Sequence, residues 1–438
     1  MLPEKALIYT MIKPKYKARI ADSILSNKLR GMGAVLIEGP KWCGKTTTAE
    51  QQASSIIYMD NPRLRESNLE AVNIDPELIL DGPVPRLIDE WQIAPKLWDA
   101  VRFTVDHRGE DGQFILTGSA VPLIGKEELM RTHTGTGRIC RMKMRTMSLW
   151  ESGDSSGKIS LASLFAGKKQ SAACATDLEQ IAYLSCRGGW PRTLFQEADI
   201  SLERATDYLD AVIHSDVNRV DGSIKNPERV ARLLRSFARH IGTSAPLSSI
   251  SSDLSSNENS TFDVRTVQAY INALKLIFVI EDMPAWNPNL RSKAAIRTSD
   301  TRYFVDPSIA TAALGIGPKD LLSDLKTFGF IFENLCVRDL RVYADALNGN
   351  VYHYRDSLGL ECDTVIHLRN GQYGLIEIKL GGDKLIQEGA ANLLKLRDKI
   401  DTDKMASPCF MMVLTAVGDF AYQRKDGVYV VPATCLKD

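Results

Sequence analysis

The amino-acid sequence predicts an α/β protein built from three modules, and three observations support this expectation. Its 438 residues are enough for about three domains at roughly 150 residues each. Short apolar runs that end in glycine or acidic residues occur toward both ends of the chain, which is typical of buried strands. Helical periodicity dominates between them, from about residue 201 to residue 241. We therefore expect α/β domains at residues 1–200 and 319–438, and a helical domain at residues 201–318.

The composition is that of an ordinary globular protein without net charge. Lysine and arginine together number 54, as do aspartate and glutamate, and 44% of the residues are hydrophobic. These values exclude a disordered chain, a collagen, and a protein whose whole surface is basic enough to bind nucleic acid. They leave a local basic patch open.

The eight cysteines have no CxxC spacing and form no zinc-binding pattern with histidine. We interpret them as scattered, reduced thiols. The N-terminus contains no apolar stretch of signal-peptide length, and the longest apolar runs fall far short of the about 20 residues that span a bilayer. The sequence therefore predicts a cytoplasmic protein without membrane contact.

A phosphate-binding loop is the strongest functional signal. A strand-like run at residues 34–38 leads directly into GPKWCGKTT, which matches G-x-x-x-x-G-K-(S/T) at every fixed position and precedes a helical stretch. Glycines let the backbone wrap a phosphate closely, and the N-terminal end of the following helix favours the same anion. The sequence thus predicts an ATP site formed by Gly39, Pro40, Lys41, Trp42, Cys43, Gly44, Lys45, Thr46 and Thr47.

Four side chains supply the chemistry that ATP hydrolysis needs. Lys45 is expected to reach the β- and γ-phosphates, and the Thr46 hydroxyl to ligate Mg²⁺. Downstream, PRLIDE places two adjacent carboxylates at the end of an apolar run. Asp89 can complete the Mg²⁺ shell, and Glu90 can polarise the attacking water. The alternative for this pair is a solvated strand end, which the complete loop upstream disfavours.

Two further positions are candidates for the same site. The run QFILTGS ends in small polar residues, so a hydroxyl of Ser119 or Thr117 can sense the γ-phosphate, or simply cap the strand. Arg138 follows a glycine-rich turn and can complete a phosphate site in its own chain or in a neighbouring copy. The second case implies a homo-oligomer. The other basic residues nearby are equally typical of a solvated strand: Arg131, Arg141, Lys143 and Arg145.

These motifs occur in an order and at a spacing that resemble the AAA-type ATPases of bacteria and archaea that carry a C-terminal domain of unknown function. The matching segments are GPKWCGKTT, RLIDEW, FILTGS, GR at 137–138, SLWE at 148–151, GGWP at 188–191, Asp216 with Arg219, and YFVD at 303–306. Lys41 stands where that family usually has arginine, and Met147 where it has proline. The resemblance covers nearly the whole chain and implies an N-terminal P-loop ATPase domain of AAA/ASCE type with three layers.

The helical domain contains an amphipathic helix and a winged-helix pattern. Its arginines recur around an apolar stripe and are either a phosphate-contacting face or a solvated one: Arg229, Arg232, Arg235 and Arg239. A Ser/Asn-rich stretch, another helix and a strand-like run follow, as in winged helices. Arg265 and Gln268 are side-chain types that can read DNA base edges from such a helix. The same fold equally serves as a protein-interaction or packing module.

The C-terminal segment brings carboxylates together with a lysine. ECDTVIHL and YGLIEIKL are strand-like runs joined by the tight-turn signal NG. On a strand, Glu377 and Lys379 point to one face, and Asp363 lies on the hairpin partner. Asp363 and Glu377 can hold Mg²⁺, and Lys379 can orient a water or stabilise developing charge. With Glu333 on the preceding helix, this order resembles the PD-(D/E)xK nuclease core, which implies an α/β restriction-endonuclease-like domain.

The sequence therefore predicts Mg²⁺-dependent binding and hydrolysis of ATP, coupled to DNA binding or cleavage by the C-terminal domain. The alternative is a nucleotide-gated regulatory or scaffold protein whose C-terminal domain is catalytically silent, and the zero net charge mildly favours it. A small-molecule kinase is disfavoured, because no acceptor site is visible and a kinase does not need the long C-terminal segment.

Overall fold

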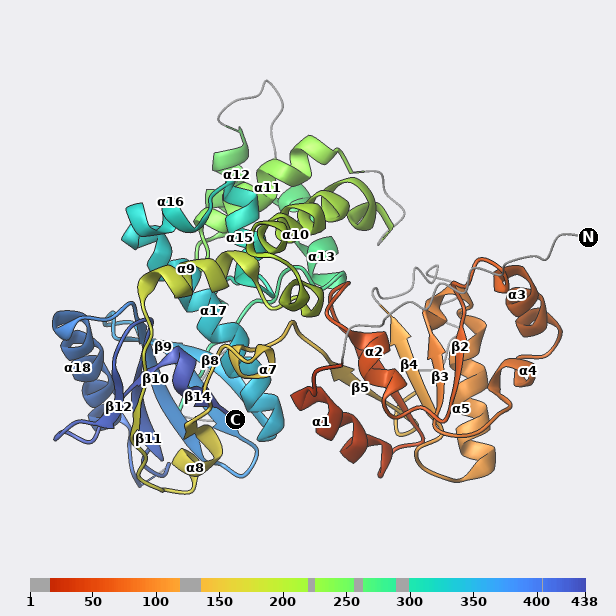
Figure 1. Ribbon diagram of the computed structural model, residues 1–438, viewed down its shortest axis with the longest axis horizontal. Coiled ribbons are helices and arrows are strands. Elements are labelled where there is room, and N and C mark those ends of the chain that lie inside the picture. The colour runs from red at the N-terminus through yellow and green to blue at the C-terminus, as the bar shows by residue number, and fades with distance from the viewer. Residues whose placement is uncertain (1–15, 119–134, 220–224, 256–262, 289–298, 404) are drawn as a thin grey trace, which may run out of the picture.

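The computed structural model describes residues 16–118, 135–219, 225–255, 263–288, 299–403 and 405–438. Three bodies make up the molecule (Figure 1). An N-terminal α/β domain and a C-terminal α/β domain lie on either side of the view, and a mostly helical domain lies above and between them. Within the ranges given, no helix combines the length and the apolar character that a membrane crossing requires.

The N-terminal domain is built on a five-stranded, all-parallel sheet in the order β2-β3-β4-β1-β5. Its strands are β1 (Ala34–Glu38), β2 (Ser55–Tyr58), β3 (Arg86–Asp89), β4 (Phe114–Gly118) and β5 (Ile139–Lys143). Along β1, Ala34 and Leu36 belong to one hydrophobic cluster, and Val35 and Ile37 to another. Both faces of the sheet are therefore covered, which explains why its central strands have continuous apolar sequences.

Helices cover the two faces of this sheet and complete three layers. They are α1 (Ile20–Leu29), α2 (Lys45–Glu50), α3 (Arg65–Ile74), α4 (Glu77–Leu80) and α5 (Lys96–Arg108). Leu97 and Val101 of α5 pack into the cluster on one face, and Leu25 of α1 packs into the cluster on the other. The expected α/β class and the three layers of the N-terminal domain are confirmed.

The middle of the chain is helical. Its helices are α9 (Leu178–Arg187), α10 (Ala198–Ala211), α11 (Pro227–Arg239), α12 (Leu247–Ser255), α13 (Val264–Leu276), α15 (Pro307–Leu314) and α16 (Pro318–Ser323), with a π-helical turn at Val212–Asp216. After α13, isolated antiparallel bridges join Ile280 to Phe304 and Met283 to Thr301. The winged helix stays a prediction, because isolated bridges rather than a paired hairpin follow these helices in the residues that the structure describes.

The C-terminal domain is built on a mixed seven-stranded sheet in the order β7-β12-β13-β11-β10-β9-β8. Its own elements are α17 (Leu325–Ala346), β8 (Gly349–Arg355), β9 (Glu361–Leu368), β10 (Tyr373–Lys379), α18 (Asp383–Lys399), β11 (Phe410–Thr415), β12 (Phe420–Gln423), β13 (Tyr429–Pro432) and β14 (Leu436–Lys437). β8, β9 and β10 are antiparallel neighbours, and β10 pairs with β11 in parallel. α17 packs on one face of the sheet and α18 on the other.

The segment after α7 (Leu149–Ser152) packs on the C-terminal domain, although the sequence assigns it to the N-terminal one. β6 (Ile159–Ser160) pairs with β14, and β7 (Ala172–Ala173) pairs with β12. Between them, α8 (Leu161–Phe165) packs against the C-terminal sheet. Strands of two residues are too short to show a period in the sequence.

A disulfide bond ties this segment to the end of the chain. It joins Cys174, which follows β7, to Cys435, and their Cα atoms lie 6.4 Å apart. The expectation that all cysteines are reduced thiols is therefore wrong for this pair. The two residues are 261 positions apart in the sequence, so spacing alone does not reveal that the fold brings them together.

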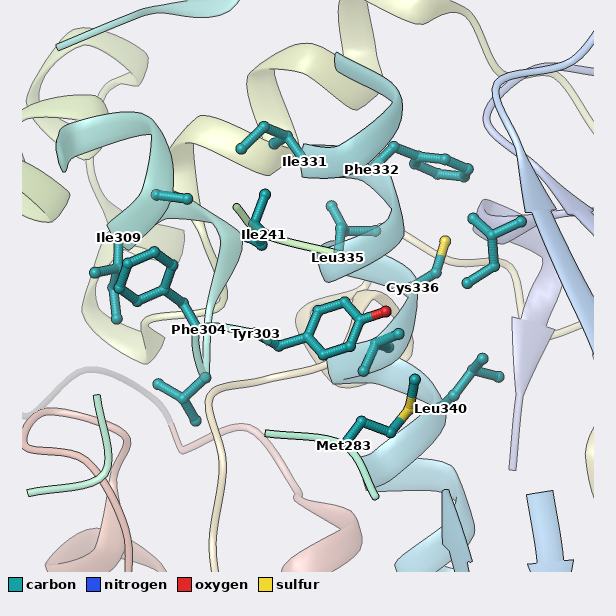
Figure 2. Close-up of a cluster of buried hydrophobic side chains, with 14 of the residues drawn as sticks. Ile241, Met283, Tyr303, Phe304, Ile309, Ile331, Phe332, Leu335, Cys336 and Leu340 are labelled. Carbon is teal, nitrogen blue, oxygen red and sulfur yellow. The ribbon is translucent and has the colours of Figure 1, made fainter. Parts of the chain in front are cut away.

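Helix α17 lies at the centre of the largest hydrophobic core. Figure 2 shows Tyr303 and Phe304 of the middle domain on the side of this helix from which Leu335 points toward Ile241. The same cluster extends from Ile241 in the middle domain to Ile376 on β10. The middle and C-terminal domains therefore share one continuous core.

A buried ion network lies inside this core. Arg338 of α17 is 3.2 Å from Asp306 and 2.7 Å from Asp339. Asp306 also accepts hydrogen bonds from Thr146 Oγ1 at 2.7 Å and from the Gly189 amide at 2.9 Å. Burial alone would raise the pKa of Asp306, but the Arg338 guanidinium and these donors outweigh it and lower that pKa. The network thus joins the segment after β5 to the middle and C-terminal domains.

We expect Arg338→Met to destabilise the protein strongly, because it leaves Asp306 and Asp339 buried without a counter-charge. Removing one partner of a buried ion pair costs about 3–5 kcal/mol. The midpoint of thermal unfolding, followed by circular dichroism, should therefore fall by roughly 5 °C or more.

The matched control is Arg355→Met, because Arg355 pairs with Glu361 in an ion pair whose two side chains are each 53% exposed. This variant should leave the unfolding midpoint nearly unchanged. Equal midpoints for the two variants would contradict the role given to the buried network.

Candidate functional site

The phosphate loop connects β1 to α2 in the conformation that its sequence demands. Gly39 has a φ of +157°, and a Cβ atom at this position would lie 2.0 Å from the Met144 carbonyl oxygen. Gly44 has a φ of +100°, in the left-handed region that favours glycine. The Lys45 ammonium donates to the Gly39 carbonyl at 2.9 Å and to the Pro40 carbonyl at 2.8 Å. The loop is therefore closed around its own lysine.

The proposed Mg²⁺ ligands come together where the first turn of α2 lies beside the end of β3. Thr46 Oγ1 donates to Asp89 Oδ1 at 2.7 Å, and Thr117 Oγ1 donates to the same oxygen. Burial raises the pKa of Asp89, and the two hydroxyl donors partly offset this effect. Hydroxyl and carboxylate oxygens fit Mg²⁺, which takes its remaining ligands from nucleotide phosphates and water. Thr117 is thus at the site, whereas Ser119 lies outside the described residues.

Glu90 lies beside this pair in a strained conformation. Its φ of +54° places it in the left-handed region, directly after β3. Gln92 Nε2 donates to Glu90 Oε2. Burial and the adjacent charge of Asp89 raise the pKa of Glu90. A strained backbone at a strand end and a carboxylate of raised proton affinity are both typical of a residue that takes a proton from water.

Arg138 lies at the opposite edge of the sheet from the phosphate loop. The Ala34 amide donates to the Arg138 carbonyl, so this arginine lies where β1 begins, whereas the loop follows where β1 ends. A strand of five residues spans roughly 16 Å at about 3.3 Å per residue. The Arg138 side chain pairs with Asp106, and its Nε atom lies 2.6 Å from Asp106 Oδ1. Within one chain, Arg138 is therefore held away from the phosphate loop. That it completes a phosphate site in a neighbouring copy stays a prediction.

Arg19 contacts the phosphate loop, and the sequence motifs do not reveal this contact. Its guanidinium donates to the Cys43 carbonyl at 2.9 Å, to the Arg145 carbonyl at 3.0 Å and to Glu151 Oε1 at 3.0 Å. Glu151 also closes a capping box with Ser148 at the start of α7. The SLWE segment therefore holds the phosphate loop in place through Arg19.

The middle domain contacts the tip of the loop. Lys41 Nζ lies 2.5 Å from Asp216 Oδ1. The Trp42 ring meets Tyr208 edge-on, with the ring centroids 5.7 Å apart, and Tyr208 in turn packs on Trp190. Asp216 and Tyr208 are functional-site candidates from outside the N-terminal domain.

The carboxylates and the lysine of the C-terminal domain converge as expected from strand alternation. Lys379 Nζ is 2.7 Å from Glu377 Oε2 and 3.1 Å from Asp363 Oδ2. The backbone pairing of β9 with β10 ends at Thr364 and Ile376, and the Asp363 carboxylate accepts the Ile378 amide at 2.7 Å instead. The two strands therefore separate where these three charged groups meet.

Glu333 completes this cluster, but the middle domain covers it. Tyr303 Oη donates a hydrogen bond to Glu333 Oε1. A Cβ atom on Gly242 would lie 3.1 Å from the Glu333 carboxylate, so the backbone of the middle domain also lies directly on it. The Glu377 side chain is 2% exposed, whereas those of Asp363 and Lys379 are 21% and 23% exposed. Glu377 is therefore the buried member of the cluster, whereas Glu333, Asp363 and Lys379 each keep part of their surface exposed.

The cluster holds three carboxyl groups and a single lysine, so full ionisation would leave it with excess negative charge. Burial and the charge of Asp363 raise the pKa values of Glu333 and Glu377 to about 8. Burial would lower the pKa of Lys379, but the two neighbouring carboxylates outweigh it and raise that pKa. Among the side chains that the structure describes, no group of three or more His, Cys, Asp or Glu is arranged to hold a metal ion. The cation between the Asp363 and Glu377 carboxylates is the Lys379 ammonium itself.

The proposed DNA contacts lie on α13, apart from both clusters in sequence and on a different element. Arg265 is exposed in the first turn of the helix. Gln268 is half-buried and donates to Asn272 Oδ1 at 2.7 Å. On α11, Arg239 lies 3.3 Å from Asp253, so this part of the arginine-rich face is paired with a carboxylate.

Three domain families match successive parts of the chain. The model of an AAA domain matches residues 32–152, that of a domain of unknown function (DUF8612) matches residues 178–320, and that of another domain of unknown function (DUF4143) matches residues 328–436. The chain is 25% identical over 371 residues to two uncharacterized proteins, Mb2031c of Mycobacterium bovis and Rv2008c of Mycobacterium tuberculosis. Each alignment covers 82% of this chain and 73% of the relative.

The solved structures that match this chain have lower sequence identities. The Walker-type ATPase of Pyrococcus abyssi is 13% identical, with a TM-score of 0.41, and the match covers 68% of this chain and 96% of that one. The ORC2 protein of Aeropyrum pernix in its ADP form is 12% identical, with a TM-score of 0.28 over 74% of this chain and 97% of that one. Scores this low support no conclusion about this chain.

The N-terminal domain is similar to an AAA domain over residues 32–152. The family model covers β1, the phosphate loop, Asp89 and Glu90, and the geometry of these residues agrees with it. Binding and hydrolysis of a nucleotide are thereby supported.

The raised pKa of Glu333 leads to a pH-dependent prediction. The ordinary pKa of glutamate is 4.5, and that of folded Glu333 is about 8. At a pH between these two values, Glu333 holds a proton in the folded protein and releases it in the unfolded chain. The stability that this residue contributes therefore falls as the pH rises through this range. We expect the stability of the natural chain relative to Glu333→Gln, which stays neutral, to fall steadily from pH 5 to pH 8 and then to level off.

Thermal unfolding midpoints of both proteins across this pH range measure the effect. The difference between them should change by at least about 2 °C in favour of Glu333→Gln as the pH rises. Parallel curves for the two proteins would show that Glu333 is ionised in the folded state throughout. Glu361→Gln, on the exposed start of β9, is the matched control and should give parallel curves.

Proposed function

We propose that this protein hydrolyses ATP with Mg²⁺ and uses the nucleotide cycle to gate a phosphodiester-cleaving site for DNA in its C-terminal domain. The observation that carries the proposal is the convergence of Asp363, Glu377 and Lys379 in a chain that also has a complete phosphate loop. A carboxylate pair with an ammonium between its members is suited to holding a divalent cation and an attacking water beside a phosphate.

At the ATP site, each residue has one task. Lys45 leaves the Gly39 and Pro40 carbonyls and binds the β- and γ-phosphates, while Thr46 and Asp89 hold the Mg²⁺. Glu90 accepts a proton from the water that attacks the γ-phosphorus, and the bond from that phosphorus to the ADP oxygen breaks. The raised pKa of Glu90 helps this step, because its carboxylate binds the proton more tightly than an exposed one does.

At the C-terminal site, Asp363 and Glu377 would hold a divalent cation at the place that Lys379 now neutralises. Lys379 would then orient the attacking water or stabilise the charge that develops on the phosphate. Thr415 supports the same assignment, because it is paired with Lys379 on the neighbouring strand and its buried hydroxyl has no hydrogen-bond partner among the described residues. A phosphate oxygen or a bound water would satisfy that hydroxyl.

The middle domain supports the coupling of the two sites, because it contacts both of them. Asp216 and Tyr208 touch the phosphate loop, whereas Tyr303 and Gly242 cover Glu333. A movement of this domain that opens Glu333 would also change the loop. The exposed start of α13, with Arg265, is the surface that we propose for DNA.

A second candidate function is a nucleotide-gated scaffold whose C-terminal domain does not cut. It is favoured by the near-complete burial of Glu377 and by the cover that the middle domain places over Glu333. The same absence of a ready three-ligand metal group among the described side chains supports it. In that case the C-terminal domain would bind a partner rather than hydrolyse one.

The first experiment is a Mg²⁺-dependent cleavage assay on single- and double-stranded DNA, with and without ATP. We expect cleavage by the natural chain, a loss of at least about 100-fold in Lys379→Ala, and no loss in Lys395→Ala, which removes an exposed lysine from α18 of the same domain. RNA of the same sequence tests the choice of substrate.

Two variants of the ATP site separate binding from hydrolysis. Lys45→Ala should lose nucleotide binding, and Glu90→Gln should bind ATP but hydrolyse it roughly 100-fold or more slowly. If cleavage follows binding alone, Glu90→Gln will cut and Lys45→Ala will not. Intact ATPase activity with no cleavage of any nucleic acid would sink the proposed function and leave the scaffold.

A further inference from the structure

The two lysines of the phosphate loop each have an intramolecular partner. Lys45 donates to two loop carbonyls, at 2.9 and 2.8 Å. Lys41 is paired with Asp216 of the middle domain, at 2.5 Å. Two ammonium groups this close in sequence, each satisfied by an intramolecular acceptor, mark a place where a multiply charged anion is to bind.

The position of Lys41 assigns it to the outer end of that anion. The Lys45 ammonium, which reaches the β- and γ-phosphates of a bound nucleotide, touches the Pro40 carbonyl. Lys41 follows Pro40 directly, so it begins beside the same end of the nucleotide. Its side chain is 38% exposed and can therefore swing, whereas the Asp216 side chain is 9% exposed and is held.

The backbone on both sides of this contact is unusual. Trp42 has a φ of +65°, which is a strained conformation for a bulky side chain, and it directs the indole ring onto Tyr208. Asp216 ends the π-helical turn Val212–Asp216, and such turns are frequent at functional sites. A cavity of about 260 Å³, lined by Pro40, Arg145 and Phe278 among others, begins next to this contact, since Pro40 directly precedes Lys41.

We infer that Lys41 binds the γ-phosphate of ATP and that Asp216 competes with this phosphate for it. The inference rests on the proposed binding of ATP at this loop. A terminal phosphate carries about two negative charges at neutral pH, against one on Asp216, so it outcompetes the carboxylate for the ammonium. ADP has no phosphate at that position and leaves the Lys41–Asp216 pair intact. The pair therefore distinguishes ATP from ADP, and Asp216 loses its partner in the loop only when the triphosphate binds.

The test compares the affinities of the full chain for ADP and for a non-hydrolysable ATP analogue, measured by calorimetry with Mg²⁺. Lys41→Met should weaken binding of the analogue about tenfold or more and change ADP binding little. Lys41→Arg should keep the preference for the analogue. Asp216→Asn should strengthen binding of the analogue several-fold, and this gain should vanish in the double variant with Lys41→Met. Lys96→Met, an exposed lysine at the start of α5, is the control and should change neither affinity.

The outcomes separate this inference from the proposed function. If the natural chain binds neither nucleotide, the proposed ATP site itself is wrong. If it binds both, and Lys41→Met weakens them equally or Asp216→Asn leaves the analogue unchanged, the ATP site stands and the competition between Asp216 and phosphate is overturned.

Discussion

The arrangement of the three domains depends on the buried charge of Asp306. Its carboxylate has no exposed surface, so every one of its acceptor positions must find a partner inside the protein. Those partners come from Thr146 after β5, Gly189 between α9 and α10, and Arg338 on α17. Arg338 in turn pairs with Asp339, which accepts the Leu149 amide at 3.0 Å. Because an unpaired charge at this depth is so unfavourable, the segments that meet here are fixed relative to one another.

This constraint places the middle domain against both candidate sites at once. Asp216 ends the π-helical turn that follows α10, and α10 packs against α15, which begins at Pro307, next to Asp306. Tyr303 lies three residues before Asp306 and bonds to Glu333. A short series of packed elements thus leads from the phosphate loop to the carboxylates of the C-terminal domain. A change at the Lys41–Asp216 pair can reach Glu333 through these contacts without crossing a flexible linker.

The sequence predicted the parts of the sites whose residues are close in the chain or are placed by strand periodicity. The phosphate loop is one continuous motif, and Asp89 follows because the ends of parallel strands meet at one edge of a sheet. Glu377 and Lys379 share a face because strand side chains alternate. The contacts that support the loop could not be predicted in this way. Arg19 meets Glu151 across 132 residues, and Lys41 meets Asp216 across 175, so only the packing of separate elements brings them together.

The segment with β6 and β7 shows the same limit. Its strands have two residues each and acquire their structure only by pairing with the end of the chain. For Arg138, the residue type and the preceding glycine-rich turn predicted a place at a phosphate site. The parallel pairing of β5 with β1 then places it at the far edge of the sheet. Residue type and local spacing therefore identify candidates, and topology decides which of them can act in one chain.

Hydrogen exchange of the full chain tests most directly whether the middle domain links the two sites. Exchange would be compared with ADP and with a non-hydrolysable ATP analogue, in the natural chain and in Asp216→Asn. We predict that the analogue changes protection at residues 208–219 and also at 301–306 and 328–340, and that ADP changes it only around the phosphate loop. In Asp216→Asn, the response to the analogue should be smaller because the contact is already broken. Changes confined to residues 34–118 with both nucleotides would contradict a link between the ATP site and the C-terminal carboxylates.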